Sequence, residues 1–432
     1  MADWTLETVL EPVGPLPKSG IGKVAVAGKI IAVAWGSALD VYTRSGLQWK
    51  GQRVIENADC LAVSCDGIHL AVASKVDVRV YRVGHDSSLN LQTTIQPTAP
   101  IGPDTQFGAA LRLHLGTLAI ADPGFSDNVG RVEFYEESTG AWAKYDHGTI
   151  DSIPDAQECF GTPADQHFGS AVAITYAMVG GKQIRRLVIG KPGVGQACQK
   201  VPPHPGHVYV FERTGEMTNA SPWTLQATLE ASPPKPGGAF GSRVAAVGDT
   251  IVVSETGKVT AFQRTNAGWQ VAFEHSDAQL ELPIGFDGDT LAFGKGSKLD
   301  PNLAESDGTF SAEPALDLPS SGGLTDVSVD GDLMAAVDKT TNTVSVFTMH
   351  PYLNVKQRYW ATINPMALVL GSHFIPLTLP DPPLPYGLRE QLRPGIDAMS
   401  RRERRTAARA IRTSIELLSS VHGMLTGRRT DR

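Results

Sequence analysis

Three side chains near residue 200 have the types and spacing that metal binding requires. His204 and His207 stand three residues apart in PPHPGH, and Cys198 precedes them in the same segment. Imidazole and thiolate groups are the ligands that zinc prefers in proteins. The Pro205-Gly206 pair between the histidines is equally typical of an exposed turn. We favour the turn and assign no metal site.

Acidic pairs are the second group that could carry chemistry. Asp287 with Asp289, and Glu136 with Glu137, place two carboxylates close together in the sequence. General acid and base catalysis uses such pairs when their pKa values differ. The chain has no HExxH motif, no GxSxG elbow and no kinase motif set. We interpret the pairs as solvated surface, assign no catalytic residue and expect that the protein is not an enzyme.

The four cysteines, Cys60, Cys65, Cys159 and Cys198, show no CxxC spacing. They are too few to form a disulfide scaffold in a chain of 432 residues. We expect buried or scattered thiols. The alternative is a disulfide between Cys159 and Cys198, which flank one pair of expected strands and would staple a long insertion.

The elements that must position these residues repeat along the chain. Each of seven segments has an alternating apolar strand, a tight turn, a second strand and a third strand with an aromatic residue near its end. A content of 41% hydrophobic residues with 44 Gly and 29 Pro fits a turn-rich globular protein. The segments open with VAVAGKIIAVA, LAVSCDGIHLAVA, LRLHLGTLAIA, VAITYAMVGGKQIRRLVIG, RVAAVGDTIVVS, LPIGFDGDTLAFG and VSVDGDLMAAV.

The spacing of the third strands indicates the architecture. Propeller blades repeat every 40 to 50 residues, with longer steps where insertions intervene. A fourth strand follows several segments, as in WKGQRVIEN and WTLQATLEA. The pattern predicts an all-β fold over residues 1–357, a seven-bladed β-propeller of four-stranded antiparallel blades. The expected aromatic ends are Tyr42, Tyr81, Tyr135, Phe211, Phe262, Phe310 in GTFSAE, and Phe347.

A ring of blades must also be closed, because an open edge would pair with other chains. WTLETVLEP at 4–12 matches the fourth strand WTLQATLEA at 223–231 at its Trp, Thr and Leu positions. We infer that the N-terminal strand supplies the outer strand of the last blade. The competing candidate is RYWATIN at 358–364.

Three segments are preceded by Phe-Gly, at 107–108, 168–169 and 240–241, and two of them contain LAIADPG and LVIGKPG. These features resemble FG-GAP repeats, the units of the integrin α-subunit propeller. The resemblance covers residues 18–350 and implies a propeller fold. The family often carries calcium in DxDxDG loops, whereas FDGDT and VDGDL place their acids in expected hairpin turns. We favour turn residues over calcium ligands and expect no cofactor.

Two insertions around the fourth segment, 151–166 and 192–206, are the longest between the expected strands. Both are rich in Pro, Gly and polar residues, and loops built on a rigid scaffold commonly carry recognition. We expect a glycan or receptor, if one is bound, to contact the loops near Asp155, Asp165, His204 and His207.

The composition changes after the last blade. The prolines of residues 358–394 predict an extended, semi-rigid linker. Ser400 and Glu403 form a capping box that begins a helix within 395–432. An apolar stripe and clustered arginines on this helix predict a basic amphipathic arm. The stripe is Ile411, Ile415, Leu418 and Leu425, and the arginines are Arg401, Arg402, Arg404, Arg405, Arg409 and Arg412.

The arm and the body differ in charge. Residues 389–432 contain 11 Arg and 5 acids, or +6, which leaves 27 basic against 40 acidic residues, or −13, in the rest. We expect the arm to anchor the propeller to another subunit or a larger assembly. The alternatives are docking on its own acidic propeller, and binding to nucleic acid or an anionic membrane surface. The arm lacks aromatic residues for base stacking, so nucleic acid is the less favoured partner.

These features predict a non-catalytic recognition or adhesion propeller that its arm tethers to a larger assembly, such as a virion surface. The alternatives are a hydrolase or lyase acting on glycans, and a cytoplasmic interaction scaffold. The first residues show no secretory signal pattern, and no stretch approaches a transmembrane helix. A virion surface or the cytoplasm is therefore the expected location.

Overall fold

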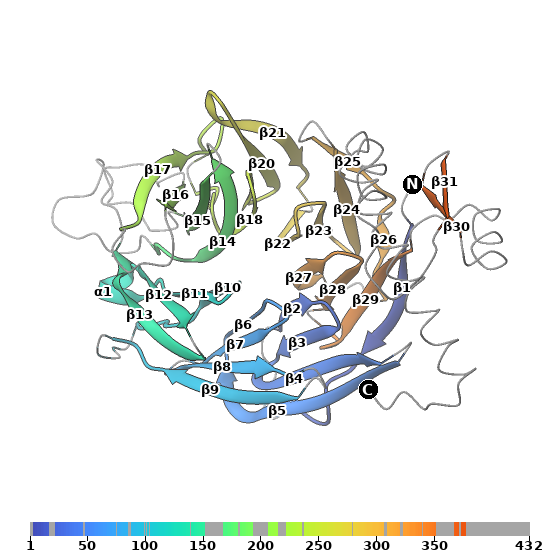
Figure 1. Cartoon of the computed structure of the whole chain (residues 1–432), viewed down its shortest axis with the longest axis horizontal. Coiled ribbons are helices and arrows are strands. Elements are labelled where there is room, and N and C mark those ends of the chain that lie inside the picture. Colours follow the sequence, from blue (N-terminus) through green and yellow to red (C-terminus); the bar gives the residue numbers. More distant parts are fainter. Residues whose placement is uncertain are drawn as a thin grey trace. The chain divides into compact units, whose positions relative to one another are not determined.

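The computed structural model describes residues 3–350, 367–370 and 373–376, apart from internal gaps. The chain divides into two compact units, of which the larger comprises Thr5–Ala304 and Gly308–Thr348. This larger unit is a seven-bladed β-propeller, and Figure 1 shows its sheets around a common centre. The gaps are 17–21, 46–47, 75, 85–87, 99, 101, 103, 139, 152–166, 180–181, 193–205, 215–221, 236, 279, 306–308, 320–322 and 339.

The first four blades follow one another along the chain, each with its strands in sequence order from the inside of the ring outward. The first blade consists of β2 (Lys23–Ala27), β3 (Ile30–Ala34), β4 (Gly36–Ser45) and β5 (Gln48–Cys60). The second consists of β6 (Ala62–Cys65), β7 (His69–Ala73), β8 (Val78–Val83) and β9 (Leu89–Ile95). The third consists of β10 (Ala110–His114), β11 (Thr117–Asp122), β12 (Arg131–Ser138) and β13 (Ala141–Asp151). The fourth consists of β14 (Ala171–Val179), β15 (Lys182–Lys191), β16 (His207–Thr214) and β17 (Thr224–Leu229).

The remaining blades complete the ring. The fifth consists of β18 (Arg243–Val247), β19 (Thr250–Glu255), β20 (Lys258–Thr265) and β21 (Gly268–Ser276). The sixth consists of β22 (Leu280–Phe286), β23 (Thr290–Lys295), β24 (Lys298–Ala304), β25 (Phe310–Ala312) and β26 (Leu316–Asp317). The seventh consists of β27 (Leu324–Asp330), β28 (Leu333–Asp338), β29 (Val344–His350) and the N-terminal β1 (Asp3–Leu10). β1 lies next to β29, so the N-terminal strand supplies the outer strand of the last blade, and 358–364 lies outside the described residues.

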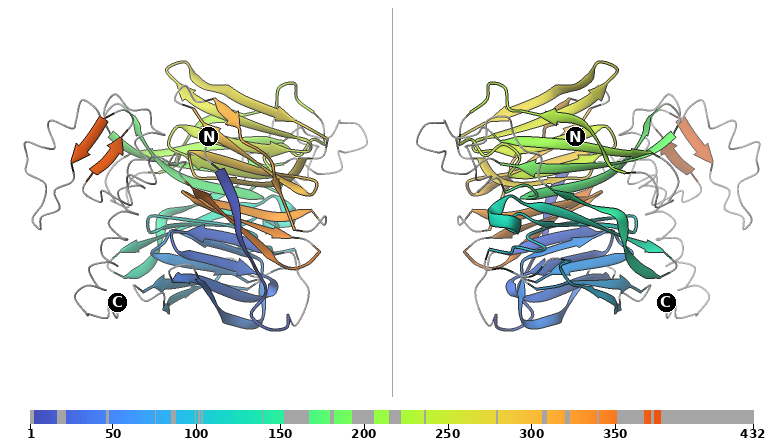
Figure 2. Two further views of the ribbon diagram at one scale, coloured as in Figure 1. Left: turned by 90° about the vertical axis from the view of Figure 1, so that its right-hand side faces the viewer. Right: turned by 90° about the vertical axis from the view of Figure 1, so that its left-hand side faces the viewer.

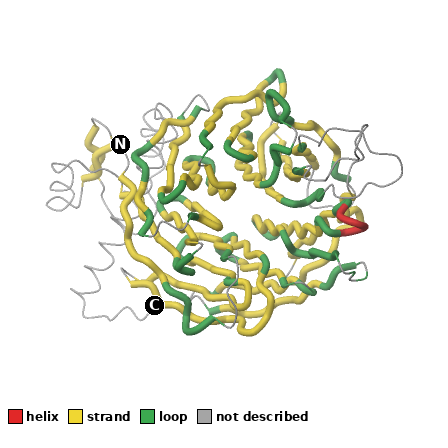
Figure 3. The backbone as a smooth tube through the Cα atoms, turned by 180° about the vertical axis from the view of Figure 1, so that it is seen from behind, coloured by secondary structure: helices red, strands yellow, loops and turns green. Residues whose placement is uncertain are grey.

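Strands make up almost all of the regular structure in the part of the chain that is described (Figure 3). The one described helix is the single turn α1 (Phe125–Asn128), which joins β11 to β12. The smaller unit of the chain contains the antiparallel pair β30 (Ala367–Leu370) and β31 (His373–Pro376). The sequence predicts an extended linker here and no hairpin. The hairpin can form because most prolines of this segment, which would bar regular pairing, lie after residue 376. The arm, 395–432, lies outside the described residues.

The apolar core lies between the blades rather than within them. Each core cluster combines residues of two neighbouring blades, as where Val33 of the first blade packs with Val346 of the seventh. The second strand of a blade is covered on both sides, and every residue of β3, β7 and β11 is buried. This coverage explains why sequences such as TLAIAD are almost continuously apolar.

The Phe-Gly pairs are packing elements of the blade interfaces. Phe107, Phe168 and Phe240 are at most 1% exposed, and each belongs to a cluster shared by two blades. Gly108 has a φ of +80°, and a Cβ atom there would lie 2.4 Å from the Cβ of Ala73 on the preceding blade. A side chain at this position would therefore meet both backbone strain and a clash.

The prediction for the third strand of the sixth blade is wrong. Phe310 lies in β25, the fourth strand of the sixth blade, and the third strand is β24, with the sequence KLDPNLA. This strand contains no aromatic residue and includes Pro301, so its sequence lacks the signals on which the expectation rests. The other six aromatic positions lie in third strands as expected.

Candidate functional site

The structure describes few of the residues that the sequence singles out for binding. Asp155, Asp165, His204 and the cysteines at 159 and 198 lie outside the described residues, as does the arm. His207 begins β16, where its Nε2 atom lies 3.3 Å from a carboxylate oxygen of Glu230. It is therefore engaged within the fourth blade.

The two described cysteines are free thiols. Burial raises the pKa of Cys60 to about 11 and the pKa of Cys65 to about 12. Both thiols therefore stay protonated at neutral pH and make poor nucleophiles. This outcome fits the expectation of buried thiols for this pair.

The described ends of both insertions lie on one face of the ring, on which the second and third strands of each blade are joined. We call it the 2–3 face. Asp151 and His167 flank the first gap. Asp151 pairs with Arg131 at the start of the third strand β12, and Ala171, shortly after the gap, pairs with Gly190 near the end of the second strand β15. Pro192 and Gly206 flank the second gap, and their neighbours Lys191 and His207 pair with each other. α1 lies on the same face (Figure 2).

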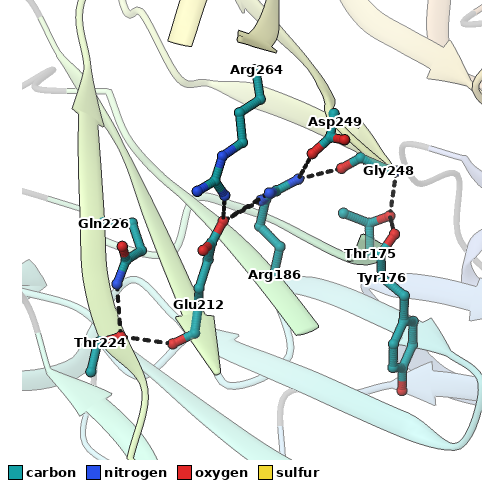
Figure 4. A network of polar contacts seen from close by, with 9 residues as sticks. All are labelled: Thr175, Tyr176, Arg186, Glu212, Thr224, Gln226, Gly248, Asp249 and Arg264. Carbon is teal, nitrogen blue, oxygen red and sulfur yellow. Dashed lines mark hydrogen bonds and ion pairs between the residues drawn. The ribbon is translucent and has the colours of Figure 1, made fainter. Parts of the chain in front are cut away.

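A polar network joins the fourth blade to the fifth (Figure 4). Arg186 of β15 is fully buried, and its Nε and Nη2 atoms donate to Glu212 at 2.9 and 2.8 Å. Its Nη1 atom donates to the carbonyl of Gly248 and, at 3.1 Å, to Asp249 on the β18–β19 turn. Arg264 of β20 also donates to Glu212. All these charges are matched within the interface, which leaves none of them for a ligand.

The preceding residue, Arg185, links the fourth blade to the third. It forms an ion pair with Glu136 of β12, and its guanidinium lies 5.5 Å from the centre of the Tyr176 ring. Burial, together with the charge of Arg213, lowers the pKa of Arg185 to about 10. Because successive side chains on a strand point to opposite sides, two adjacent arginines serve two interfaces.

Acids in the first hairpin turns connect neighbouring blades. The Asp287 carboxylate accepts from the backbone N–H groups of Asp289 and Thr290 in its own turn, and from Gly331 of the next blade at 2.7 Å. Asp330 accepts from Gly28 of the first blade at 2.6 Å. These contacts assign the first acid of FDGDT and the first acid of VDGDL to turn and interface roles. No group of three or more His, Cys, Asp or Glu among the described residues is placed to hold a metal ion.

A cavity of about 550 Å³ opens on the sixth blade, where the β23–β24 turn lies on the 2–3 face. Its lining includes Lys295 at the end of β23, Lys298 at the start of β24 and Asp300 further along β24. Lys295 lies 2.8 Å from Asp277, and Lys298 lies 3.1 Å from Asp317. The volume is in the range of cavities that hold small ligands.

A bulge in the outer strand forms one wall of this cavity. β25 pairs with β24 through Asn302 and Ala312, and β26 pairs with it through Leu299 and Leu316. Three residues, 313–315, thus stand opposite two, 300–301, as in a β-bulge. Pro314 lies within the bulge and cannot donate a ladder hydrogen bond. The outer strand therefore bends away from β24.

His275 of the fifth blade also lines the cavity. Its ring centroid is 5.1 Å from that of Phe293, which is fully buried. The Nε2 atom of His275 is buried and has no hydrogen-bond partner among the described residues. Such an atom is costly unless water or a ligand satisfies it.

The cavity is not predicted by the repeat pattern of the sequence. One signal was available: the outer strand of the sixth blade, FSAEPALD, has a proline and lacks the Trp found in WKGQ, WTLQ and WQVA. A break in the outer strand follows from that proline. The position of His275 at the cavity cannot be predicted from the sequence in this way, because it depends on how the fifth and sixth blades pack together.

No family model and no curated protein matches the chain. Three solved structures are similar in fold. The propeller domain of Cps50 (Swd1) from Myceliophteria thermophila has a TM-score of 0.53 at 13% identity, over 81% of this chain and 100% of that domain. The periplasmic gluconolactonase PpgL of Pseudomonas aeruginosa has a TM-score of 0.46 at 15% identity, over 72% of this chain and 89% of the enzyme.

The third structure is PorZ, a bacterial surface component of the type-IX secretion system of Porphyromonas gingivalis. It has a TM-score of 0.47 at 10% identity, over 80% of this chain and 39% of PorZ. At such identities, the likeness to the Swd1 domain supports the propeller fold and nothing about activity. No helix in the described part of the chain is long and apolar enough to span a bilayer.

Proposed function

We propose that this protein is a non-catalytic recognition propeller that its C-terminal arm, 395–432, tethers to a larger assembly. The tether follows from the basic, amphipathic sequence of the arm and from the opposite charge of the body. A virion surface is one assembly that would suit this layout. The recognition role follows from the scaffold that the ring provides.

The distribution of charged groups in the described ring is the observation that supports this proposal. Ion pairs and hydrogen bonds between neighbouring blades engage the side chains of Arg185, Arg186 and Asp287. The open features, which are the sixth-blade cavity and the described ends of both insertions, lie on the 2–3 face. A rigid ring with its variable parts on one face suits binding of a partner.

The tethering role can be tested with a pair of matched double variants of the full chain. Ile411→Asp with Leu418→Asp places charges on the apolar stripe, whereas Thr413→Asp with Ser420→Asp places them on the opposite side of the predicted helix. We expect the first pair to abolish copurification with the native assembly, because a docked helix buries its apolar side. The second pair should copurify like the wild type.

Equal copurification of both double variants would refute the tether. The non-catalytic role has its own test, in which the purified protein is incubated with glycans that it binds. Binding without any product is expected. Turnover that a single carboxylate substitution abolishes would show a glycan-acting enzyme instead.

A further inference from the structure

We propose that the sixth-blade cavity binds a neutral sugar residue, such as a terminal hexose of a glycan. The inference deepens the recognition function proposed above and rests on it. It depends on three features of the cavity: its balanced charge, its unpartnered histidine and its mixed polar and apolar walls.

The charge of the lining favours an uncharged ligand. Lys295 and Lys298 contribute two positive charges, and Asp300 and Glu313 contribute two negative ones. Both lysines are also paired with acids, Asp277 and Asp317, that do not line the cavity. With these partners counted, two lysines stand beside four carboxylates, so an anion would be repelled and a cation would compete with the lysines for carboxylates.

Hydroxyl groups can hydrogen-bond to both the lysines and the carboxylates of the lining, whereas a cation or an anion can pair with only one of these two kinds of group. Each hydroxyl donates one hydrogen bond and accepts up to two, so a polyol can donate to carboxylates and accept from ammonium groups. The buried Nε2 atom of His275 has no partner among the described residues and would gain one from a ligand hydroxyl. A hexose presents several hydroxyls in one rigid ring, which limits the entropy lost on binding.

The remaining walls suit the carbon side of a sugar ring. Pro301, Ala312 and Ala315 line the cavity with small apolar groups, and Phe293 lies behind His275. These side chains are nearly rigid, so they add apolar contact at low entropic cost. A volume of about 550 Å³ accommodates a sugar residue with its attachment oxygen.

The expected affinity is modest. A ligand of about 12 non-hydrogen atoms with ordinary ligand efficiency corresponds to a Kd of about 2 mM. Saturation-transfer NMR detects binding in this range. The probes are the methyl glycosides of glucose, galactose, mannose and N-acetylglucosamine, with acetate, phosphate and methylammonium as charged comparisons.

Full-length protein and three variants distinguish the cavity from other surfaces. Ala315 is an exposed wall residue, so Ala315→Trp should fill the cavity without disturbing the core. Ala267→Trp, on the exposed β20–β21 turn, is the matched control. His275→Phe keeps the packing against Phe293 and removes both ring nitrogens.

We expect at least one methyl glycoside to bind the wild type and Ala267→Trp alike, more than tenfold weaker binding to Ala315→Trp, and several-fold weaker binding to His275→Phe. No glycoside binding at about ten times the expected Kd would overturn the proposal. So would binding that Ala315→Trp leaves unchanged, or competition by the charged probes. Each of these three outcomes concerns the cavity alone, because copurification through the arm is measured separately.

Discussion

Arg185 and Arg186 show how much of a blade interface can depend on single residues. The two side chains point to opposite sides of β15, and each meets a carboxylate of its own blade or a neighbouring one. Arg186 also lies 4.8 Å from the centre of the Trp269 ring, which adds a cation–π contact. Buried charges of this kind are stable only while every partner is present.

Arg186→Met should therefore destabilise the propeller. The variant keeps most of the aliphatic stem but leaves Glu212, which is 6% exposed, with one guanidinium instead of two. We expect the free energy of unfolding to fall by about 3 kcal/mol, measured by urea denaturation. Asp317→Asn, which removes an ion pair at an 84% exposed carboxylate, is the control and should cost less than about 1 kcal/mol. Equal effects of the two variants would contradict the assigned role of Arg186.

Asp338 gives the fold a defined dependence on pH. Burial alone would raise the pKa of this carboxyl, but hydrogen bonds from the backbone and hydroxyl groups of Thr340 and Thr341 hold its pKa below its usual value. Folding thus stabilises the ionised form. The contribution is complete above the unfolded pKa and is lost as the pH falls through the lower, folded pKa.

The neutral variant Asp338→Asn tests this assignment. At pH 6.5 the wild type should be more stable than the variant by about 1 kcal/mol, because hydrogen bonds to a charged acceptor are the stronger ones. The difference should shrink as the pH is lowered past the usual pKa of an aspartate carboxyl. Chemical denaturation at pH 6.5 and pH 3 measures it, and a difference that does not change with pH would count against the assignment.

At the scale of elements, the ring is closed by β1 and by the segment that follows it. Residues 11–16 are the first part of the connection from β1 of the seventh blade to β2 of the first. Asp40 of β4 is fully buried and accepts from the backbone N–H of Val13, from the indole of Trp35 and from Arg53. Arg53 also donates to the carbonyl oxygens of Gly14 and Pro15. This cluster fastens the connecting segment to the first blade.

Removal of residues 1–16 should open the ring. The outer edge of β29 would then be unpaired, so we expect a truncated protein that is less stable and self-associates, as seen by thermal denaturation and light scattering. A synthetic peptide of residues 1–16 should restore a monomer of near-native stability. A peptide of residues 1–10, which lacks the segment bound through Asp40 and Arg53, should restore less. Unchanged stability after the truncation would show that β1 does not close the ring.

The sequence predicts the elements better than the site. Alternating apolar strands joined by Gly-containing turns identify seven blades, because each strand repeats the same burial. The sixth blade is misread at one strand, since KLDPNLA carries neither an aromatic residue nor a regular alternation. The cavity depends on this irregular blade and on His275 from its neighbour. Contacts of that kind, between residues of different blades, have no local pattern in a sequence.

At the scale of the whole molecule, we propose that the ring recognises a partner and that the arm, 395–432, attaches the ring to a larger assembly. The ring is rigid because neighbouring blades share their cores and exchange hydrogen bonds between their turns, as Asp66 does with Gly116 at 3.3 Å. Such a ring can hold a binding face constant while the arm attaches it elsewhere. The −13 charge of the body would make the bodies of different copies repel one another. The +6 charge of residues 389–432 would favour binding of the arm to an acidic partner.

The most direct test of the tethered propeller compares the full chain with residues 1–387 expressed in the native source. Both are purified by the same N-terminal tag, and the proteins that accompany each are quantified by mass spectrometry after mild crosslinking. We expect residues 1–387 to keep the thermal stability of the ring and to lose the partners that accompany the full chain. Partners retained in full by residues 1–387 would contradict it.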